Sequence, residues 1–211
     1  MDLKDPDLVI IPGTKNTIAD LKWLRMSGLE AMIMKKHSEG CLIMGICGGY
    51  QMLGHKISDP ENVEGGGSIH GLGLLPLVTE FSPEKTRLQV SGESGIIKGP
   101  FESLSRVRID GYEIHMGKTF PIYGDKDPGE DGSLLYADGN VCGSFVHGLF
   151  DTRQMQQAMI RTLLKRKGLE DIPMRYIDDS EYKQQQYDIL ADTLREYLDM
   201  ERIYRIMQGS C

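Results

Sequence analysis

The 211-residue sequence lacks long apolar runs: none approaches the roughly 20 residues that a membrane-spanning helix requires. Basic residues are also in the minority, with 24 Lys and Arg against 31 Asp and Glu and a formal net charge of −7. This balance disfavours nucleic-acid and anionic-membrane partners, because both need a basic surface. The first ten residues carry acids and show no signal-peptide pattern. We therefore expect a cytoplasmic protein with neither kind of partner.

Cysteine is scarce as well. The four residues, Cys41, Cys47, Cys142 and Cys211, form no CxxC pair and have no zinc-ligand spacing. Reduced thiols are therefore expected rather than a disulfide scaffold, and no metal site is expected. The remaining composition is that of a globular protein, with 40% hydrophobic and 26% charged residues. Since no repeat or linker interrupts it, the sequence predicts one domain over residues 1–211.

The first part of the chain alternates between strand-like and helix-like segments. Residues 7–11 form a β-rich run stopped by Pro12 and Gly13, and residues 41–46 form a second apolar run. Helices are expected between and after these runs: one capped by Asn16, one over residues 29–39 and one over residues 48–53. This order predicts an α/β fold, a three-layer open and mostly parallel sheet with flanking helices.

The rest of the chain is less regular. Residues 59–100 are rich in glycine, proline and charge, with only short β-like pieces. Residues 124–132 indicate an acidic, solvated loop. Further strands are expected over residues 106–117 and 141–148, and helices over residues 152–167 and about 180–207. Asp151 and Gln154 have the spacing of a helix capping box.

The stretch Gly45-Ile46-Cys47-Gly48-Gly49 ends the second apolar run and carries the chemistry. A residue between a buried strand and a helix must turn sharply, and small neighbours permit the crowded backbone. The turn lifts the side chain above the sheet edge, as in the G-x-S-x-G nucleophile elbow, here with sulfur in place of the hydroxyl. Because open α/β sheets bind ligands at the carboxyl ends of their strands, Cys47 is the candidate nucleophile.

Such a nucleophile needs a base. A free thiol has a pKa near ~8.5 and is mostly protonated at pH 7, while a helix N-terminus supplies only about 0.3–1 kcal/mol. Histidine is the usual partner of a catalytic cysteine. His115 and His147 each end an expected strand, and the residues alone leave these two equally placed. The other three histidines, His37, His55 and His70, are expected at the surface and need no catalytic role.

Five segments together resemble the glutamine amidotransferase domain of the cobyric acid synthase family. They are residues 9–25 (VIIPGTKNTIADLKWLR), 44–54 (MGICGGYQMLG), 111–117 (GYEIHMG), 144–151 (SFVHGLFD) and 182–200 (YKQQQYDILADTLREYLDM). The resemblance extends over nearly the whole chain. It implies the flavodoxin-like fold of class I glutamine amidotransferases and a glutaminase activity that feeds ammonia to an ATP-dependent ligase.

The resemblance also assigns the nucleophile and the base. It implies that Cys47 attacks the side-chain amide of glutamine to form a glutamyl thioester. His147 matches the family's catalytic histidine, which would take the thiol proton and protonate the departing ammonia. Many class I enzymes have an orienting glutamate two residues after this histidine, whereas this chain has Leu149. A Cys–His dyad is therefore expected.

The remaining site residues follow from the same resemblance. The backbone N–H groups of Gly13 and Gly48 match the positions that form the oxyanion hole. Gln51 and His115 are expected to contact the substrate. The expected partners are glutamine, a synthetase domain and, through that domain, the corrinoid cobyrinic acid a,c-diamide, which the family amidates to cobyric acid.

The family's ligase reaction needs ATP and Mg, yet this chain has no G-x-x-x-x-G-K-[ST] phosphate-binding loop. We therefore expect no cofactor in this chain and place ATP and Mg in the separate synthetase domain. Family members begin with further strand and helix material before the segment at residues 7–11. The chain is accordingly expected to be the C-terminal part of a longer ligase, without the family's N-terminal strand.

Two alternative functions stay open. The glutaminase subunit of a peptidoglycan-precursor amidating ligase shares the G-x-C-G-G-Y-Q pattern and the dyad. The segments IPGTKNT and DLKWLR, with the C-terminal helix, favour the corrinoid ligase over that subunit. A non-catalytic binding domain on the same fold would lack the nucleophile or the base, and this sequence has both.

Overall fold

The computed structural model describes residues 3–123, 133–173 and 179–209. The chain forms two compact units, residues 1–170 and residues 171–211. No helix of the described residues is long and apolar enough to cross a membrane. The acidic loop expected over residues 124–132 lies outside the described residues.

A four-stranded sheet forms the centre of the first unit, with strand order β1-β2-β8-β7. Its strands are β1 (Leu8–Ile11), β2 (Leu42–Ile46), β8 (Val141–Ser144) and β7 (Tyr136–Asp138). β1 and β8 both run parallel to β2, and β7 is antiparallel at one edge. Ile11 pairs with Gly45, and Ile46 pairs with Ser144, so the parallel strands end at the same edge.

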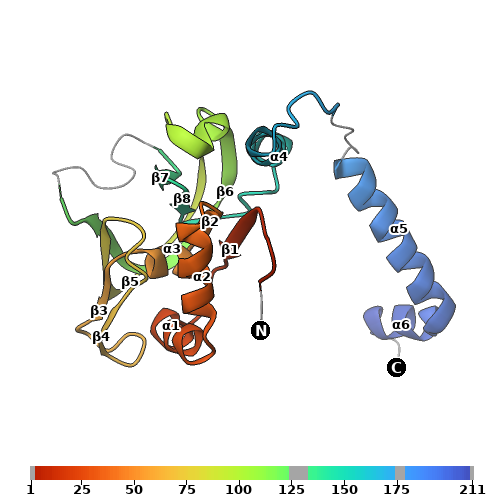
Figure 1. Ribbon diagram of the computed structural model, residues 1–211. Coiled ribbons are helices and arrows are strands. Elements are labelled where there is room, and N and C mark those ends of the chain that lie inside the picture. Colours follow the sequence, from red (N-terminus) through yellow and green to blue (C-terminus); the bar gives the residue numbers. More distant parts are fainter. Residues whose placement is uncertain (1–2, 124–132, 174–178, 210–211) are drawn as a thin grey trace. The chain divides into compact units, whose positions relative to one another are not determined.

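Helices cover both faces of this sheet (Figure 1). They are α1 (Thr17–Met26), α2 (Leu29–Ser38), α3 (Gly48–Leu53), the 3-10 helix η1 (Gly99–Leu104) and α4 (Arg153–Arg166). Ile43 packs into the core that α1, α2 and α3 share, whereas its neighbours Leu42 and Met44 pack into the core formed with η1 and α4. A strand buried on both faces is typical of parallel α/β sheets, and the predicted fold class is confirmed.

A second sheet holds five strands in the order β4-β3-β5-β6-β9. They are β3 (Lys56–Asp59), β4 (Gly67–His70), β5 (Leu77–Glu93), β6 (Arg108–Pro121) and β9 (Val146–His147). β3 and β5 are parallel, and the other pairs are antiparallel. The sequence predicted only short β-like pieces where β5 runs for 17 residues. Much of β5 is exposed, so its sequence is polar and lacks the apolar run of a buried strand.

The single strand expected over residues 141–148 is two strands in different sheets. The hydroxyl of Ser144 donates to the carbonyl of Leu134 (2.5 Å) and accepts from the N–H of Val146 (3.0 Å). These bonds turn the chain at Phe145 from β8 into β9. The strand expected over residues 106–117 is also longer, so His115 lies inside β6 rather than at its end.

Two predictions about helix ends are corrected. Thr152, not Asp151, caps α4, because its hydroxyl accepts from the N–H of Met155 (3.4 Å). The helix expected over residues 180–207 is two helices in the second unit, α5 (Asp179–Tyr197) and α6 (Met200–Met207). The break occurs because Asp199 caps α6 through the N–H of Arg202 (2.9 Å).

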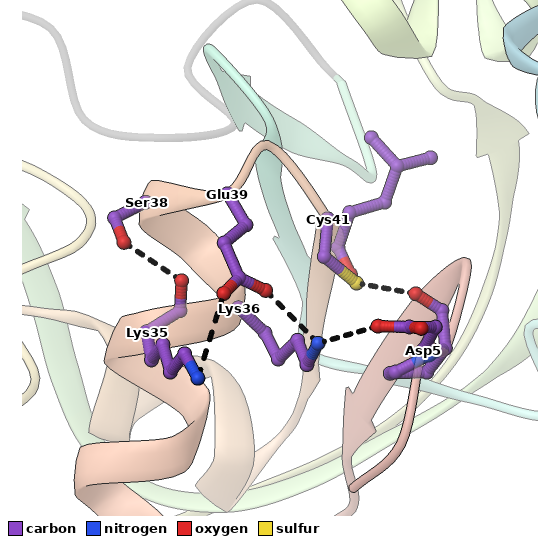
Figure 2. Close-up of polar contacts among 8 residues, drawn as sticks. Asp5, Lys35, Lys36, Ser38, Glu39 and Cys41 are labelled. Carbon is purple, nitrogen blue, oxygen red and sulfur yellow. Dashed lines mark hydrogen bonds and ion pairs between the residues drawn. The ribbon is translucent and has the colours of Figure 1, made fainter.

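Polar contacts tie the segment before β1 to the end of α2 (Figure 2). The ammonium of Lys36 pairs with Asp5 and with Glu39, each at 2.9 Å. The thiol of Cys41 donates to the carbonyl of Pro6 (3.1 Å). These contacts hold β1 beside β2 at its amino end, opposite the edge where the loop after β1 approaches α3.

The substitution Gly49→Ala should lower the free energy of unfolding by about 3 kcal/mol or more. A Cβ atom at this position would lie 2.0 Å from the carbonyl oxygen of Ile11 and 2.8 Å from that of Pro12. Both contacts are to backbone, so α3 and β1 would have to separate. Urea denaturation measures the change.

The matched control is Gly28→Ala. Gly28 has φ +80° with nothing within 4 Å of an added Cβ, so only the left-handed backbone cost of about 1–2 kcal/mol applies. Equal unfolding midpoints for the two variants would contradict the close approach of α3 to β1.

Candidate active site

Cys47 occupies the turn between β2 and α3. Its backbone has φ +52° and ψ −112°, a region that residues other than glycine rarely adopt. The N–H of Cys47 donates to the carbonyl of Ser144 (2.8 Å), and its carbonyl accepts from the N–H of Gln51 (3.0 Å). The structure therefore shows the sharp strand-to-helix turn that the glycine pattern predicts, held at both ends by hydrogen bonds.

Three of the predicted site residues converge at this turn. A Cβ atom on Gly13 would lie 3.1 Å from Cε1 of His147 and 3.4 Å from Cβ of Cys47. The imidazole and the nucleophile's side chain are thus neighbours of the same loop residue. Gly48 follows Cys47 directly at the start of α3. Cys47, His147 and the two residues expected to form the oxyanion hole are thus brought to one place.

His147 is held by an aromatic contact. Its imidazole stacks on the ring of Tyr112, with centroids 5.2 Å apart and planes 10° from parallel. In the part of the chain that the structure describes, no carboxylate accepts a hydrogen bond from this imidazole. Leu149, which stands where many class I enzymes have a glutamate, is 2% exposed. Within the described ranges His147 thus stacks on an aromatic ring without a hydrogen bond to a carboxylate, and the expected Cys–His dyad stays a prediction.

A pocket of about 200 Å³ opens beside Cys47. Its lining includes Cys47, Gly48, Gln51, Glu64, Lys85 and His115. A larger cavity of about 640 Å³ lies along β1, and neither a thiol nor an imidazole lines it. The smaller pocket therefore contains the candidate nucleophile and His115, whereas His147 and Gly13 lie outside its lining.

Gln51 forms a wall of this pocket and is 2% exposed. Its Nε2 donates to the carbonyl of Met116 (3.1 Å), and its Oε1 accepts from the hydroxyl of Thr17 (3.3 Å). Both ends of the amide are thus engaged within the protein, and the side chain links α1, α3 and β6. The expected substrate contact of Gln51 stays a prediction.

His115 lies on β6 at the same pocket, stacked on Phe145 at 4.1 Å between ring centroids. Its Nε2 is 3.4 Å from Oε2 of Glu113. Its Nδ1 is buried and has no hydrogen-bond partner among the described residues. Since a buried polar atom without a partner is costly, this nitrogen is a candidate contact for a bound ligand.

The electrostatic environment of Cys47 favours the neutral thiol. Burial raises the pKa of this thiol, the N–H of Gly48 acts in the opposite direction, and the carboxylates of Glu113 and Glu64 raise the pKa further. The thiol also donates weakly to the carbonyl of Ile114 (3.5 Å). A base must therefore remove the proton when the thiol reacts.

Sequence reasoning missed three residues of this site, Glu64, Lys85 and Tyr112. Glu64 belongs to the stretch rich in glycine, proline and charge, in which the sequence predicted only short β-like pieces. In the structure the residues after Asp59 form a compact turn, because the carboxylate of Asp59 accepts hydrogen bonds from the N–H groups of Val63, Glu64 and Gly66 (2.7–2.8 Å). The Asp-Pro pair and the following glycines signal a turn, but they do not tell where the turn directs Glu64.

The parallel sheet, the thiol on a strained turn and the adjacent imidazole define the α/β glutamine amidotransferase fold. A solved structure titled "Structure of PurLQS from Thermotoga maritima" shares this fold, with a TM-score of 0.53 and 19% identity. The match covers 79% of this chain and 82% of that one. Residues 1–155 match the family model described as "CobB/CobQ-like glutamine amidotransferase domain", and the chain belongs to that family.

Curated relatives carry the name cobyric acid synthase. The chain is 46% identical over 225 residues to the one from Lachnoclostridium phytofermentans, covering 98% of this chain and 44% of the relative. It is 43% identical over 217 residues to the one from Ruminiclostridium cellulolyticum, covering 98% and 42%. The family predicted from the sequence is confirmed, and the chain spans less than half the length of these relatives. The domain extent expected over residues 1–211 stays a prediction.

Iodoacetamide should label Cys47 in the resting chain at a rate whose half-maximal point lies above pH ~8.5, the midpoint of an ordinary thiol. The reason is the raised pKa of the buried thiol, which keeps the thiolate a minor species at this pH. Peptide mass spectrometry across pH 7–10 measures the rate. Cys142, which is 0% exposed, is the internal control and should stay unlabelled while the fold is intact. A plateau below pH 8 would contradict the neutral resting thiol.

Proposed function

We propose that this chain hydrolyses glutamine to glutamate and ammonia and supplies the ammonia to an ATP-dependent amidation of corrinoid carboxylates. The observation that carries the proposal is the convergence of Cys47, His147 and Gly13 around one point beside a small polar pocket. The names of the curated relatives support the corrinoid as the acceptor.

The reaction begins when the thiol of Cys47 adds to the amide carbon of the substrate. His147 accepts the thiol proton as the carbon–sulfur bond forms, and the amide oxygen takes up the negative charge. The N–H of Gly48, which interacts with the sulfur of Cys47 in the resting chain, is the first proposed donor to that oxygen. The N–H of Gly13 is the second donor. Removing one such donor typically costs ~10²–10³ in rate, so the backbone of both glycines matters more than their side-chain identity.

The tetrahedral intermediate then loses ammonia. His147 gives its proton to the departing nitrogen, the carbon–nitrogen bond breaks, and a glutamyl thioester remains on Cys47. Water adds to the thioester with His147 again as the base, and glutamate leaves as the thiol is restored. Stacking on Tyr112 keeps the imidazole plane fixed through both halves, which serves in place of an orienting carboxylate.

The polar wall of the pocket binds the substrate in this proposal. The unpartnered Nδ1 of His115 is available for a hydrogen bond to the substrate. Gln51 contacts the bound glutamine. Its hydrogen bonds with Thr17 and Met116 hold α1 and β6 together around the pocket.

The rest of the reaction belongs to a synthetase part. The chain spans 44% of one relative and 42% of another, so those relatives contain more than this region. In the proposal that additional part binds ATP, Mg and cobyrinic acid a,c-diamide and activates a carboxylate. This chain then needs no cofactor of its own, and its product ammonia is the nucleophile for the activated carboxylate.

Cys47→Ala should abolish glutamine hydrolysis, and His147→Ala should lower kcat by about 10²–10⁴-fold, the usual contribution of a general base. His115→Ala should be milder and act mainly through KM, because its role is binding. Steady-state ammonia release measures all three, with Cys41→Ala as the thiol control. A larger kcat loss for His115→Ala than for His147→Ala would show that the base is assigned wrongly.

Ammonia release by this chain alone should be slow and should rise when the synthetase part of a relative is added with ATP and the corrinoid. The reason is that the resting thiol is neutral and not activated in advance. Cys47→Ala in the same mixture, supplied with ammonium chloride instead of glutamine, should still support amidation. An isolated chain that already works at the rate of the mixture would contradict the coupling.

A further inference from the structure

The start of α1 is held by a carboxylate from the second sheet. Oε2 of Glu64 accepts hydrogen bonds from the N–H groups of Thr17 (2.6 Å) and Ile18 (3.4 Å), the first two residues of the helix. Such N–H groups have no acceptor inside their own helix and need one from elsewhere. Glu64 lies in the turn between β3 and β4, so this contact ties the start of α1 to the second sheet.

This contact differs from the helix's own cap. Oδ1 of Asn16 accepts from the N–H of Ala19 (2.8 Å), which satisfies α1 from the residue directly before it. A local cap of this kind moves with the helix and does not determine where the helix lies. Glu64 is 47 positions away from Thr17, so its hydrogen bonds locate the start of α1 against a separate part of the molecule.

The turn that carries Glu64 is itself held by hydrogen bonds. The carboxylate of Asp59, which ends β3, is 1% exposed and accepts from three N–H groups of the turn (2.7–2.8 Å). The N–H of Glu64 is one of these donors (2.7 Å). The backbone of Glu64 is thus fixed to the second sheet while its side chain reaches α1.

Both oxygens of the Glu64 carboxylate face the first turn of α1. Burial raises the pKa of this carboxyl, and the N–H groups of Ile18 and Thr17 act in the opposite direction. Oε1 has a longer contact of 3.5 Å with the hydroxyl of Thr17. These contacts indicate that the position supplies hydrogen-bond acceptors to the helix start, for which the negative charge itself is not required.

The start of α1 packs on the proposed oxyanion donor Gly48. A Cβ atom on Gly48 would lie 2.5 Å from Cγ2 of Thr14 and 3.2 Å from Oγ1 of Thr17. The hydroxyl of Thr17 also donates to Oε1 of Gln51 in α3 (3.3 Å). The other proposed donor, Gly13, directly precedes Thr14. A shift of the helix start would therefore move the loop with Gly13 relative to Gly48.

We propose that Glu64 is a positioning residue for the oxyanion hole, because its hydrogen bonds to the start of α1 fix the loop with Gly13 against Gly48. The inference rests on the proposed glutaminase function and adds a residue that acts on the reaction without touching the substrate. A displaced donor weakens stabilisation of the negative oxygen in the transition state and leaves binding of the ground state nearly unchanged. Loss of the acceptor at position 64 therefore acts on kcat rather than on KM.

Two substitutions in the full chain separate the acceptor from the charge. Glu64→Gln removes the charge and keeps an oxygen for the N–H groups of Thr17 and Ile18, whereas Glu64→Ala removes both. Glu64→Ala should lower kcat for glutamine hydrolysis about 10–100-fold, the scale of a misplaced catalytic group, and change KM less than about threefold. Glu64→Gln should recover most of this loss. Steady-state ammonia release over a range of glutamine concentrations measures both parameters.

Two further variants complete the set. Glu64→Asp keeps the charge but is one methylene shorter, so it should lose kcat as Glu64→Ala does, and it replaces that variant if urea denaturation shows that Glu64→Ala is unfolded. Glu61→Gln, which changes an exposed acid in the same turn, is the matched control and should behave as the unsubstituted chain.

Alkylation of Cys47 by iodoacetamide is the second readout, because this reaction forms no oxyanion. Glu64→Ala and Glu64→Gln both remove a carboxylate that raises the pKa of the thiol, so both should react at pH 7.5 at least as fast as the unsubstituted chain. Equal kcat values for these two variants, a loss confined to KM, or slower alkylation would each overturn the positioning role. Absence of Cys47-dependent ammonia release from the unsubstituted chain would instead refute the proposed function itself.

Discussion

The close approach of α3 to the end of β1 is the constraint on which the rest of the site depends. A Cβ atom at Gly49 would lie 2.0 Å from the carbonyl oxygen of Ile11, and one at Gly45 would lie 2.7 Å from the carbonyl oxygen of Gly49. These contacts leave no room for a side chain. They place the loop with Gly13 against the turn with Cys47, so packing of backbone on backbone fixes the distance between the candidate nucleophile and the proposed oxyanion donor Gly13.

The second sheet carries the candidate base, His147, whereas the first sheet leads into the candidate nucleophile, Cys47. Cys47 follows a strand of the parallel sheet, whereas His147 ends β9, which pairs with β6 of the other sheet through Tyr112. The turn at Phe145 between β8 and β9 carries the chain from one sheet to the other within a few residues. The candidate dyad therefore lies where the two sheets meet, and both of its residues border Gly13 because the expected single strand is broken.

The parallel sheet could be predicted because strands buried on both faces are apolar. The turn at Cys47 could be predicted because the glycines on both sides of it are typical of a sharp strand-to-helix turn. The sequence could not reveal the long pairing of β5 with β6, whose exposed residues are polar. The choice between His115 and His147 needed the family resemblance, since both follow apolar segments. The position of Glu64 could not be predicted from local patterns. Its contact with Thr17 spans 47 residues, and no sequence periodicity relates positions that far apart.

The charges around Cys47 bear on its reactivity. In the resting chain burial and the carboxylates of Glu113 and Glu64 all disfavour the thiolate, so little glutamine-independent chemistry is expected from the thiol. Free glutamine is a zwitterion and adds no net charge to the pocket, so its binding does not by itself supply a cation to the sulfur. The thiol proton must therefore pass to a base at the moment of attack. The imidazole of His147, which borders the same residue Gly13 as the side chain of Cys47, is the proposed acceptor. This dependence on proton transfer agrees with slow ammonia release by the chain alone.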